Sequence, residues 1–255
     1  MAKINRTNSF PFFNLNSSTV SAFSLNNKTS FSPDDLTKNS EPLLLVERLT
    51  THITLIVTII GLIGNACTVI VLNRQSMRKW RSSMLLTALA AVDFLYLLII
   101  FLSIVDTLSN QMIGLHRSLI LCHVTVYITH VCSFLSANFT LSFTLQRFVA
   151  VLFPLHADTI ISSRSSIINI LSLTFFGCGF YLFSFFVTNL SQGTCREDET
   201  HPVLYPLLIV DTCLTFLLPF ICIVIFNCSI VYKLRTRKKF TSIFGECFLK
   251  GNERE

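Results

Sequence analysis

The sequence is short of charge. Only 13% of its 255 residues are charged, which is about half the share found in a typical soluble domain, whereas 51% are hydrophobic. So few charged side chains are not enough to cover a water-soluble domain. Long and nearly uncharged apolar runs recur along the chain instead. The composition therefore predicts an all-α, polytopic membrane helix bundle.

Motifs for several other classes of function are missing. The sequence has no nucleophile–base pair, metal-ligand spacing or phosphate-binding loop, so we do not expect an enzyme. The formal net charge of +6 is accompanied by no nucleic-acid-binding motif. The sequence has a single acid at mid-membrane depth and no visible internal repeat, so it does not favour a transporter or channel. No apolar run precedes residue 43, so we expect no cleavable signal peptide and a first membrane helix that directs insertion.

Five apolar runs are long enough to cross a bilayer, which needs about 20 apolar residues of helix. We expect these helices at about residues 43–72, 84–105, 119–151, 167–187 and 203–232. The expected organisation is a disordered outer tail over residues 1–42, a transmembrane bundle over 43–235 and a basic tail over 236–255.

The basic residues predict the orientation. They gather in the loop at 73–83 and in the segment at 233–239, and the positive-inside rule places such segments in the cytoplasm. The N-terminal tail contains glycosylation sequons at Asn5, Asn16 and Asn27, which require an outer location. We therefore expect a multi-pass plasma-membrane protein with its N-terminus outside and its C-terminus in the cytoplasm.

The run at 119–151 has a cysteine near its start and an arginine near its end. Cys122 and Arg147 are 25 residues apart, roughly 37 Å along a helix, so the thiol and the guanidinium are expected just beyond opposite faces of the bilayer. Cys195 follows the fourth run and is expected on the outer side with Cys122. The two thiols either remain free or form a bridge, which would close a loop of about 70 residues and contribute about 4 kcal/mol.

Asp93 lies about ten residues into the second run and so close to the middle of the bilayer. A carboxylate at that depth is costly unless it faces the bundle and is paired or hydrated. Asn65 and Ser136 are polar residues near the middle of the first and third runs. The three side chains either converge on a small cation with its waters or form an interhelical hydrogen-bond cluster.

Several motifs follow one another in a characteristic order. They are Asn65 in GLIGNACTVIVL, Asp93 in LTALAAVDF, Cys122, Gln146-Arg147-Phe148, Pro154-Leu155, Cys195, and Pro219 in FLLPF. In residue type, order and spacing, this series resembles the class A (rhodopsin-like) G-protein-coupled receptors. The resemblance covers about residues 53–235 and implies that the five runs correspond to helices 1–5 of a seven-helix receptor.

The resemblance implies roles for the buried positions. Asp93, Ser136 and Asn65 would hold an allosteric sodium ion, and we expect no cofactor apart from this ion. Cys122 and Cys195 would form the outer disulfide.

The resemblance also implies a heterotrimeric G protein as the partner on the cytoplasmic side. The residues expected to face it are Gln146, Arg147, Pro154 and Leu155.

The implied ligand site lies between the outer halves of the third and fifth helices. Its expected residues are Thr125, Thr129, His130, Ser133 and Asp211. Thr129 stands where amine receptors carry an aspartate, so we do not expect a small monoamine. Asp211 favours a basic peptide with Asp211 as its counter-ion, and so do the acids of the outer loops, which are Asp106, Glu197, Asp198 and Glu199. The loop acids can equally be solvated surface groups.

Three departures indicate a divergent member of the family. Gln146 replaces the acid that usually precedes the arginine, and Asn227 replaces a tyrosine of the fifth helix. The usual tryptophan of the fourth helix is absent, and Phe175 and Phe176 stand in that region.

No sixth or seventh apolar run follows the fifth in this sequence. One expectation is that this sequence is an incomplete form of a peptide receptor. The alternative is a five-helix variant that does not signal but associates with full-length receptors and alters their folding or trafficking. Asp93 and Asn65 would need such a partner, because polar groups are costly against lipid.

Overall fold

The computed structural model describes residues 33–74, 83–109, 114, 118–155, 157, 161–191, 194–197 and 202–252. The predicted glycosylation sites Asn5, Asn16 and Asn27 lie outside these residues.

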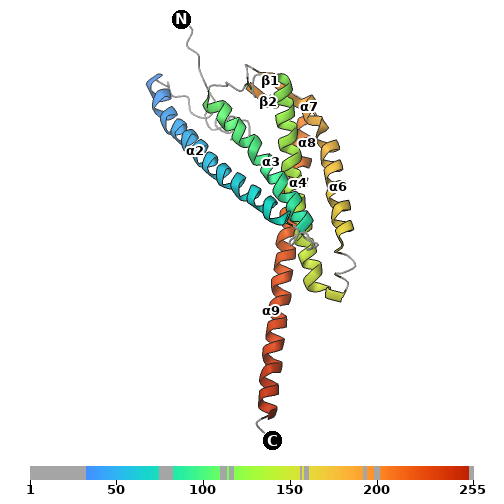
Figure 1. Cartoon of the computed structure of the whole chain (residues 1–255). Helices are drawn as coiled ribbons and strands as arrows, with labels where there is room; N and C mark the ends of the chain where they lie inside the picture. The colour runs from blue at the N-terminus through green and yellow to red at the C-terminus, as the bar shows by residue number, and fades with distance from the viewer. Residues whose placement is uncertain are drawn as a thin grey trace.

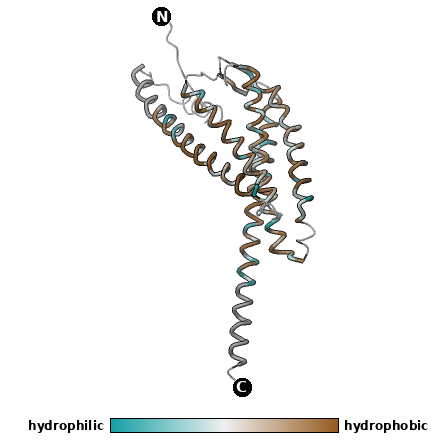
Figure 2. The backbone as a smooth tube through the Cα atoms, viewed as in Figure 1, coloured by the Kyte–Doolittle hydropathy of each residue, from teal (hydrophilic) through white to brown (hydrophobic). Residues whose placement is uncertain are grey.

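The described residues contain five helical stretches that are long and apolar enough to cross a membrane. Figure 1 shows them running along one another, and Figure 2 shows hydrophobic residues distributed along each of them. The bounds of these stretches are Arg48–Leu72, Ser83–Leu108, Leu119–Leu152, Ser163–Val187 and Leu204–Arg237. The prediction of an all-α membrane helix bundle is confirmed.

The first spanning helix is part of α2 (Pro33–Leu72), which packs against α3 (Ser83–Leu108). A Cβ atom added to Gly61 would lie 2.6 Å from Cδ1 of Leu97, so the small residue permits a close approach of the two helices. α2 begins at Pro33 rather than at the predicted residue 43, and the last ten residues of the predicted tail are therefore helical. Proline suits a first helical position, where the missing N–H is not needed.

α4 (Leu119–Leu152) is the central helix of the bundle and packs against α3, α6 and α9. In the most apolar part of its spanning stretch, 44% of the residues are buried, against 6% in the corresponding part of α2. Thr129, Thr140 and Thr144 each donate a hydroxyl hydrogen bond to the carbonyl four residues earlier, at 2.7 to 2.9 Å. Hydroxyls satisfied within their own helix let α4 carry polar residues in an apolar setting.

The fourth spanning stretch consists of α6 (Ser163–Phe180), the short 3₁₀ turn η1 (Tyr181–Phe183) and α7 (Ser184–Val187). α6 begins after Ser162, whose hydroxyl accepts a hydrogen bond from the backbone N–H of Ser165 at 3.1 Å. This cap satisfies one of the amide groups that a helix start leaves unpaired.

A β-hairpin follows α7, between the fourth and fifth predicted helices. Strands β1 (Thr188–Ser191) and β2 (Thr194–Glu197) are antiparallel, with Leu190 opposite Cys195. Strands of four residues are too short for an alternating pattern to be recognised in a sequence. β1 also packs against α4, so the hairpin depends on a contact that the local sequence does not contain.

The fifth spanning stretch is interrupted by a π-helical turn. α8 (Leu204–Thr212) leads into η2 (Cys213–Leu217), and α9 (Leu218–Asn252) continues from there. Pro219 has no N–H and cannot continue the α-helical hydrogen-bond ladder of the preceding turn. Figure 1 shows α9 extending well beyond the rest of the bundle. Most of the predicted basic tail is therefore helical.

The main hydrophobic core lies between α3, α4 and η1. Its buried members are Leu85, Val131, Phe134, Leu135, Phe139 and Tyr181. Tyr181 is the largest side chain that is fully buried, and it connects this core with the polar cluster described below.

Candidate functional site

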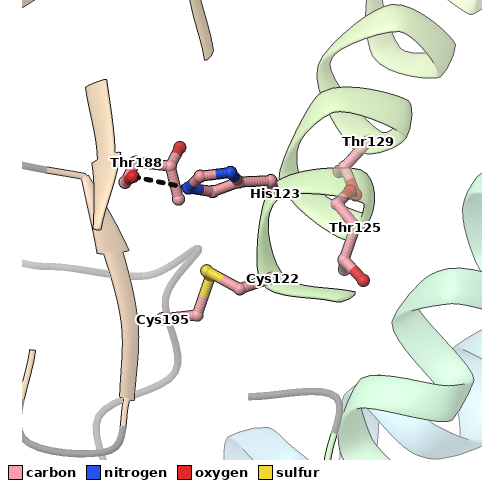
Figure 3. Close-up of a disulfide and its surroundings, with 6 residues drawn as sticks. All are labelled: Cys122, His123, Thr125, Thr129, Thr188 and Cys195. Atoms are coloured by element: carbon pink, nitrogen blue, oxygen red, sulfur yellow. Dashed lines mark hydrogen bonds between the residues drawn. A yellow bond between two sulfur atoms is a disulfide. The ribbon is translucent and has the colours of Figure 1, made fainter. Parts of the chain in front are cut away.

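A disulfide joins the N-terminal end of α4 to the hairpin. Cys122 and Cys195 are bonded, their Cα atoms lie 5.6 Å apart, and both residues are buried. Figure 3 shows the bond crossing from α4 to the strand. The bonded pair is the one expected from the sequence.

His123 forms a second connection beside the disulfide. Its Nε2 atom lies 2.8 Å from the carbonyl oxygen of Thr188, so the ring donates a hydrogen bond to the first residue of β1. The imidazole also meets the Phe185 ring edge-on at 5.8 Å. The hairpin is thus held on α4 by one covalent and one polar contact (Figure 3). The sequence analysis did not identify His123.

Three polar residues, His130, Tyr181 and Thr215, surround Asp211 of α8. We call these four residues together the Asp211 cluster. The Tyr181 hydroxyl donates a short hydrogen bond to Oδ1 of Asp211. The Thr215 hydroxyl donates to the same oxygen at 2.9 Å, and the Tyr181 and Thr215 oxygens are also 2.9 Å apart. Nδ1 of His130 lies 3.8 Å from the other carboxylate oxygen, Oδ2.

Packing fixes the geometry of the Asp211 cluster. The rings of His130 and Tyr181 stack with an interplanar angle of 14° and a centroid distance of 5.5 Å. Tyr181 is fully buried, whereas the His130 and Asp211 side chains remain 16% and 18% exposed. The carboxylate is therefore held from its buried side by two neutral donors, with Oδ2 directed toward His130.

The sequence analysis missed Tyr181 and Thr215. Thr215 follows Asp211 by four residues and so lies on the same helix face, which is a signal that the sequence contains. Tyr181 is 30 residues from Asp211 in the chain, and no local pattern connects the two.

The other expected ligand residues have different surroundings. Thr129 is buried, and its hydroxyl donates to the carbonyl of Thr125 within α4 at 2.7 Å. Figure 3 shows Thr125 and Thr129 on the side of α4 away from the hairpin. Ser133 is half-buried on the same helix. Of the five residues proposed from the sequence, the structure brings His130 and Asp211 together.

Asp106, one of the expected outer acids, is fully buried and therefore not a solvated surface group. Its Oδ1 accepts a hydrogen bond from the backbone N–H of Gly114 at 3.0 Å. Gly114 has a φ of 74°, which favours glycine. Asp106 thus fixes the position of this residue near the end of α3. The side chain of Glu197 and the residues 198–199 lie outside the described part of the chain.

The middle of the bundle contains the residues of the expected sodium site. Ser136 lies near the Asp93 carboxyl group, and Asn65 lies on α2, which packs against α3. A carboxylate and a hydroxyl are oxygen ligands suited to a hard cation. Within the described ranges, no group of three His, Cys, Asp or Glu side chains could hold a metal ion.

At the C-terminal end of α4, neighbouring residues take different partners. Gln146 donates from Nε2 to the Ser166 hydroxyl on α6 at 3.0 Å. Arg147 is exposed, and its guanidinium carbon lies 4.2 Å from the centre of the Phe143 ring, one turn earlier. Pro154 and Leu155 follow the end of α4 and are exposed. The structure therefore turns Gln146 toward α6 and leaves Arg147 on a cation–π contact.

These helices, with the disulfide-bound hairpin at one end of α4, define a multi-pass helical membrane protein. Residues 64–242 match the family of seven-transmembrane receptors known as the rhodopsin family. Because the match covers more than half of the chain, the protein belongs to this family. No significant match to a curated protein accompanies this assignment.

Proposed function

We propose that this protein is a plasma-membrane receptor for a peptide ligand with a basic group. Its N-terminus would face the outside, and it would pass the signal to a heterotrimeric G protein. The observation that carries the ligand proposal is the position of Asp211. Its side chain is mostly buried within a membrane-spanning stretch and yet keeps one carboxylate oxygen directed away from its two neutral donors.

An ionised carboxylate in this setting favours a cationic partner. Hydrogen bonds from Tyr181 and Thr215 stabilise the negative charge of Asp211 but do not neutralise it. His130 is the nearest basic side chain that the structure brings to Asp211, and 3.8 Å is longer than a hydrogen bond. A cationic group of the ligand could approach more closely and gain a charge-assisted hydrogen bond.

The cytoplasmic end of α4 supports the G-protein part of the proposal. Arg147 is exposed there, with Phe143 beneath its guanidinium rather than a carboxylate beside it. An accessible arginine is a suitable donor for the carbonyl and carboxylate groups of a protein partner. Gln146 would act indirectly, by fixing α4 against Ser166 of α6.

The ligand proposal can be tested by selecting peptides from a random library on the protein held in lipid nanodiscs. We expect the selected peptides to be enriched in basic residues. Asp211→Asn should weaken their binding at least tenfold, which corresponds to about 1.4 kcal/mol. Thr212→Ala is the matched control, because Thr212 is exposed and donates only to Leu208 of its own helix. Peptides without basic enrichment, or equal binding to Asp211→Asn, would contradict the proposal.

A further inference from the structure

The two oxygens of the Asp211 carboxylate are not equivalent. Oδ1 accepts hydrogen bonds from both Tyr181 and Thr215. Oδ2 has His130 at 3.8 Å. Tyr181 is fully buried in the main core, so its hydroxyl cannot move away without disturbing that core.

This asymmetry limits which cation the carboxylate can recognise. A guanidinium group binds a carboxylate most strongly through two parallel hydrogen bonds, one to each oxygen. An ammonium group is a compact charge that can bind through a single oxygen. With Oδ1 occupied by two donors, the paired arrangement is blocked and the single-oxygen arrangement remains.

We propose that Tyr181 is a specificity-determining residue that makes Asp211 select an alkylammonium group over a guanidinium group. The preferred ligand group would be a lysine side chain or an N-terminal amine. The inference rests on the proposed function, since it assumes that Asp211 faces the basic group of the ligand. Tyr181 acts by holding and partly occupying the carboxylate, and so it is a positioning residue that need not touch the ligand.

The surroundings of Oδ2 agree with a single cation of limited size. His130 is stacked on Tyr181, and its ring therefore lies beside Oδ2 in a fixed orientation. A guanidinium group that bound both oxygens would have to displace the hydrogen bond from Tyr181 or Thr215. The displaced donor would then be left unpaired, and a buried donor left unpaired is costly.

The test compares three small probes on the full chain in nanodiscs by saturation-transfer difference NMR. The probes are Nα-acetyl-lysinamide, Nα-acetyl-argininamide and the neutral Nα-acetyl-norleucinamide. On the unmodified protein we expect the lysine probe to bind at least threefold more tightly than the arginine probe, and the neutral probe more weakly than both. Asp211→Asn should remove the advantage of both cations.

Tyr181→Phe keeps the ring and removes only the hydroxyl. We expect it to release Oδ1 and to improve arginine-probe binding relative to the lysine probe at least threefold. A purely structural role would weaken both probes equally. Tyr205→Phe is the matched control, because Tyr205 is 77% exposed on α8, and it should leave the ratio unchanged. Should Tyr181→Phe fold poorly, Thr215→Val removes the other donor to Oδ1 and should shift the ratio in the same direction.

The outcomes separate the two proposals. An arginine probe that binds as tightly as the lysine probe to the unmodified protein would overturn the selectivity and leave a cation-binding Asp211 intact. A ratio that neither Tyr181→Phe nor Thr215→Val changes would overturn the role of the two donors. If neither cation binds better than the neutral probe, both this inference and the proposed ligand class are wrong.

Discussion

Tyr181 lies where the hydrophobic core of the bundle meets the polar Asp211 cluster. Its ring lies 5.9 Å from Phe134 and 5.0 Å from Phe180, while its hydroxyl reaches Asp211 and Thr215. A buried tyrosine needs a partner for its hydroxyl, and here the partner is a carboxylate on another helix. The aromatic packing between α4 and α6 therefore forms without the tryptophan that the family usually carries.

Gln146 illustrates how a departure from the family pattern becomes a different contact. In the sequence, Gln146 replaces the acid that usually precedes the arginine. In the structure the Gln146 amide binds Ser166. One turn earlier on α4, the Ser142 hydroxyl accepts a hydrogen bond from Nδ2 of Asn169 at 3.2 Å. The residue that would pair with the arginine instead extends a polar contact between α4 and α6.

At the residue scale, the proposed sodium site predicts an ion-dependent stability. Sodium chloride should raise the thermal unfolding midpoint of the purified protein above that in choline chloride, because an ion bound only by the folded state stabilises it. Asp93→Asn should abolish this difference, since the carboxylate would carry most of the ion's coordination charge. The measurement is a thermal unfolding scan at equal ionic strength in both salts.

Ser136→Ala should reduce the sodium effect without removing it, because Asp93 would remain. A sodium-dependent rise that persists in Asp93→Asn would show that this aspartate does not bind the ion. The pair with Ser136 would then be an interhelical hydrogen bond that serves packing alone.

At the scale of elements, α6 packs tightly against α4 at a glycine, Gly177. A Cβ atom on Gly177 would lie 3.0 Å from Cδ1 of Phe134. Phe134 cannot easily give way, because it is buried against Phe176 and Tyr181 at 5.7 and 5.9 Å. We expect Gly177→Ala to lower the free energy of unfolding by about 1–3 kcal/mol through overpacking, measured by thermal or denaturant unfolding in detergent.

Gly179→Ala provides the control on the same helix. No heavy atom lies within 4 Å of a Cβ added there, and alanine favours helix over glycine by about 1 kcal/mol. This variant should be neutral or stabilising. Equal destabilisation by both substitutions would show that the helix backbone, and not the contact with Phe134, is sensitive at this point.

The interruption of the fifth stretch places a polar residue where it is needed. Thr215 lies within the π-helical turn η2, ahead of Pro219, and its hydroxyl donates to Asp211. Turns of this kind are often found at functional sites. The helix interruption next to Pro219 therefore includes a residue of the Asp211 cluster.

At the scale of the whole molecule, the proposed orientation can be checked in intact cells. The basic residues near the end of the fifth stretch are exposed, and positive charge of this kind is retained in the cytoplasm. An N-terminal epitope tag should bind antibody on unpermeabilised cells, and a C-terminal tag only after permeabilisation. Replacement of Asn5, Asn16 and Asn27 by Gln should remove any mobility shift caused by a glycosidase.

The opposite labelling pattern would reverse the proposed orientation. It would also place the Cys122–Cys195 bond on the reducing side of the membrane, where such bonds are rare. The disulfide and the tag accessibility thus test the same assignment by independent chemistry.

The spanning helices were predictable because a bilayer imposes a one-dimensional requirement on the chain. A run of apolar residues of sufficient length is visible in a sequence without knowledge of what it packs against. The structure begins α3 at Ser83, one residue from the predicted start, and begins α4 at Leu119 as predicted. The helical parts of α2 and α9 outside the apolar runs carry no such signal, and they were not predicted.

The sequence by itself determined the class of fold, the family, and the position of each polar residue along its helix. Those properties depend on residue order, length and spacing along single helices. Only the tertiary structure decided the partners of those residues: His123 with the hairpin, Gln146 with Ser166, and Tyr181 with Asp211. The physical reason is that a partner depends on how each helix is rotated about its axis and on side chains tens of residues away. Both are set when the helices pack.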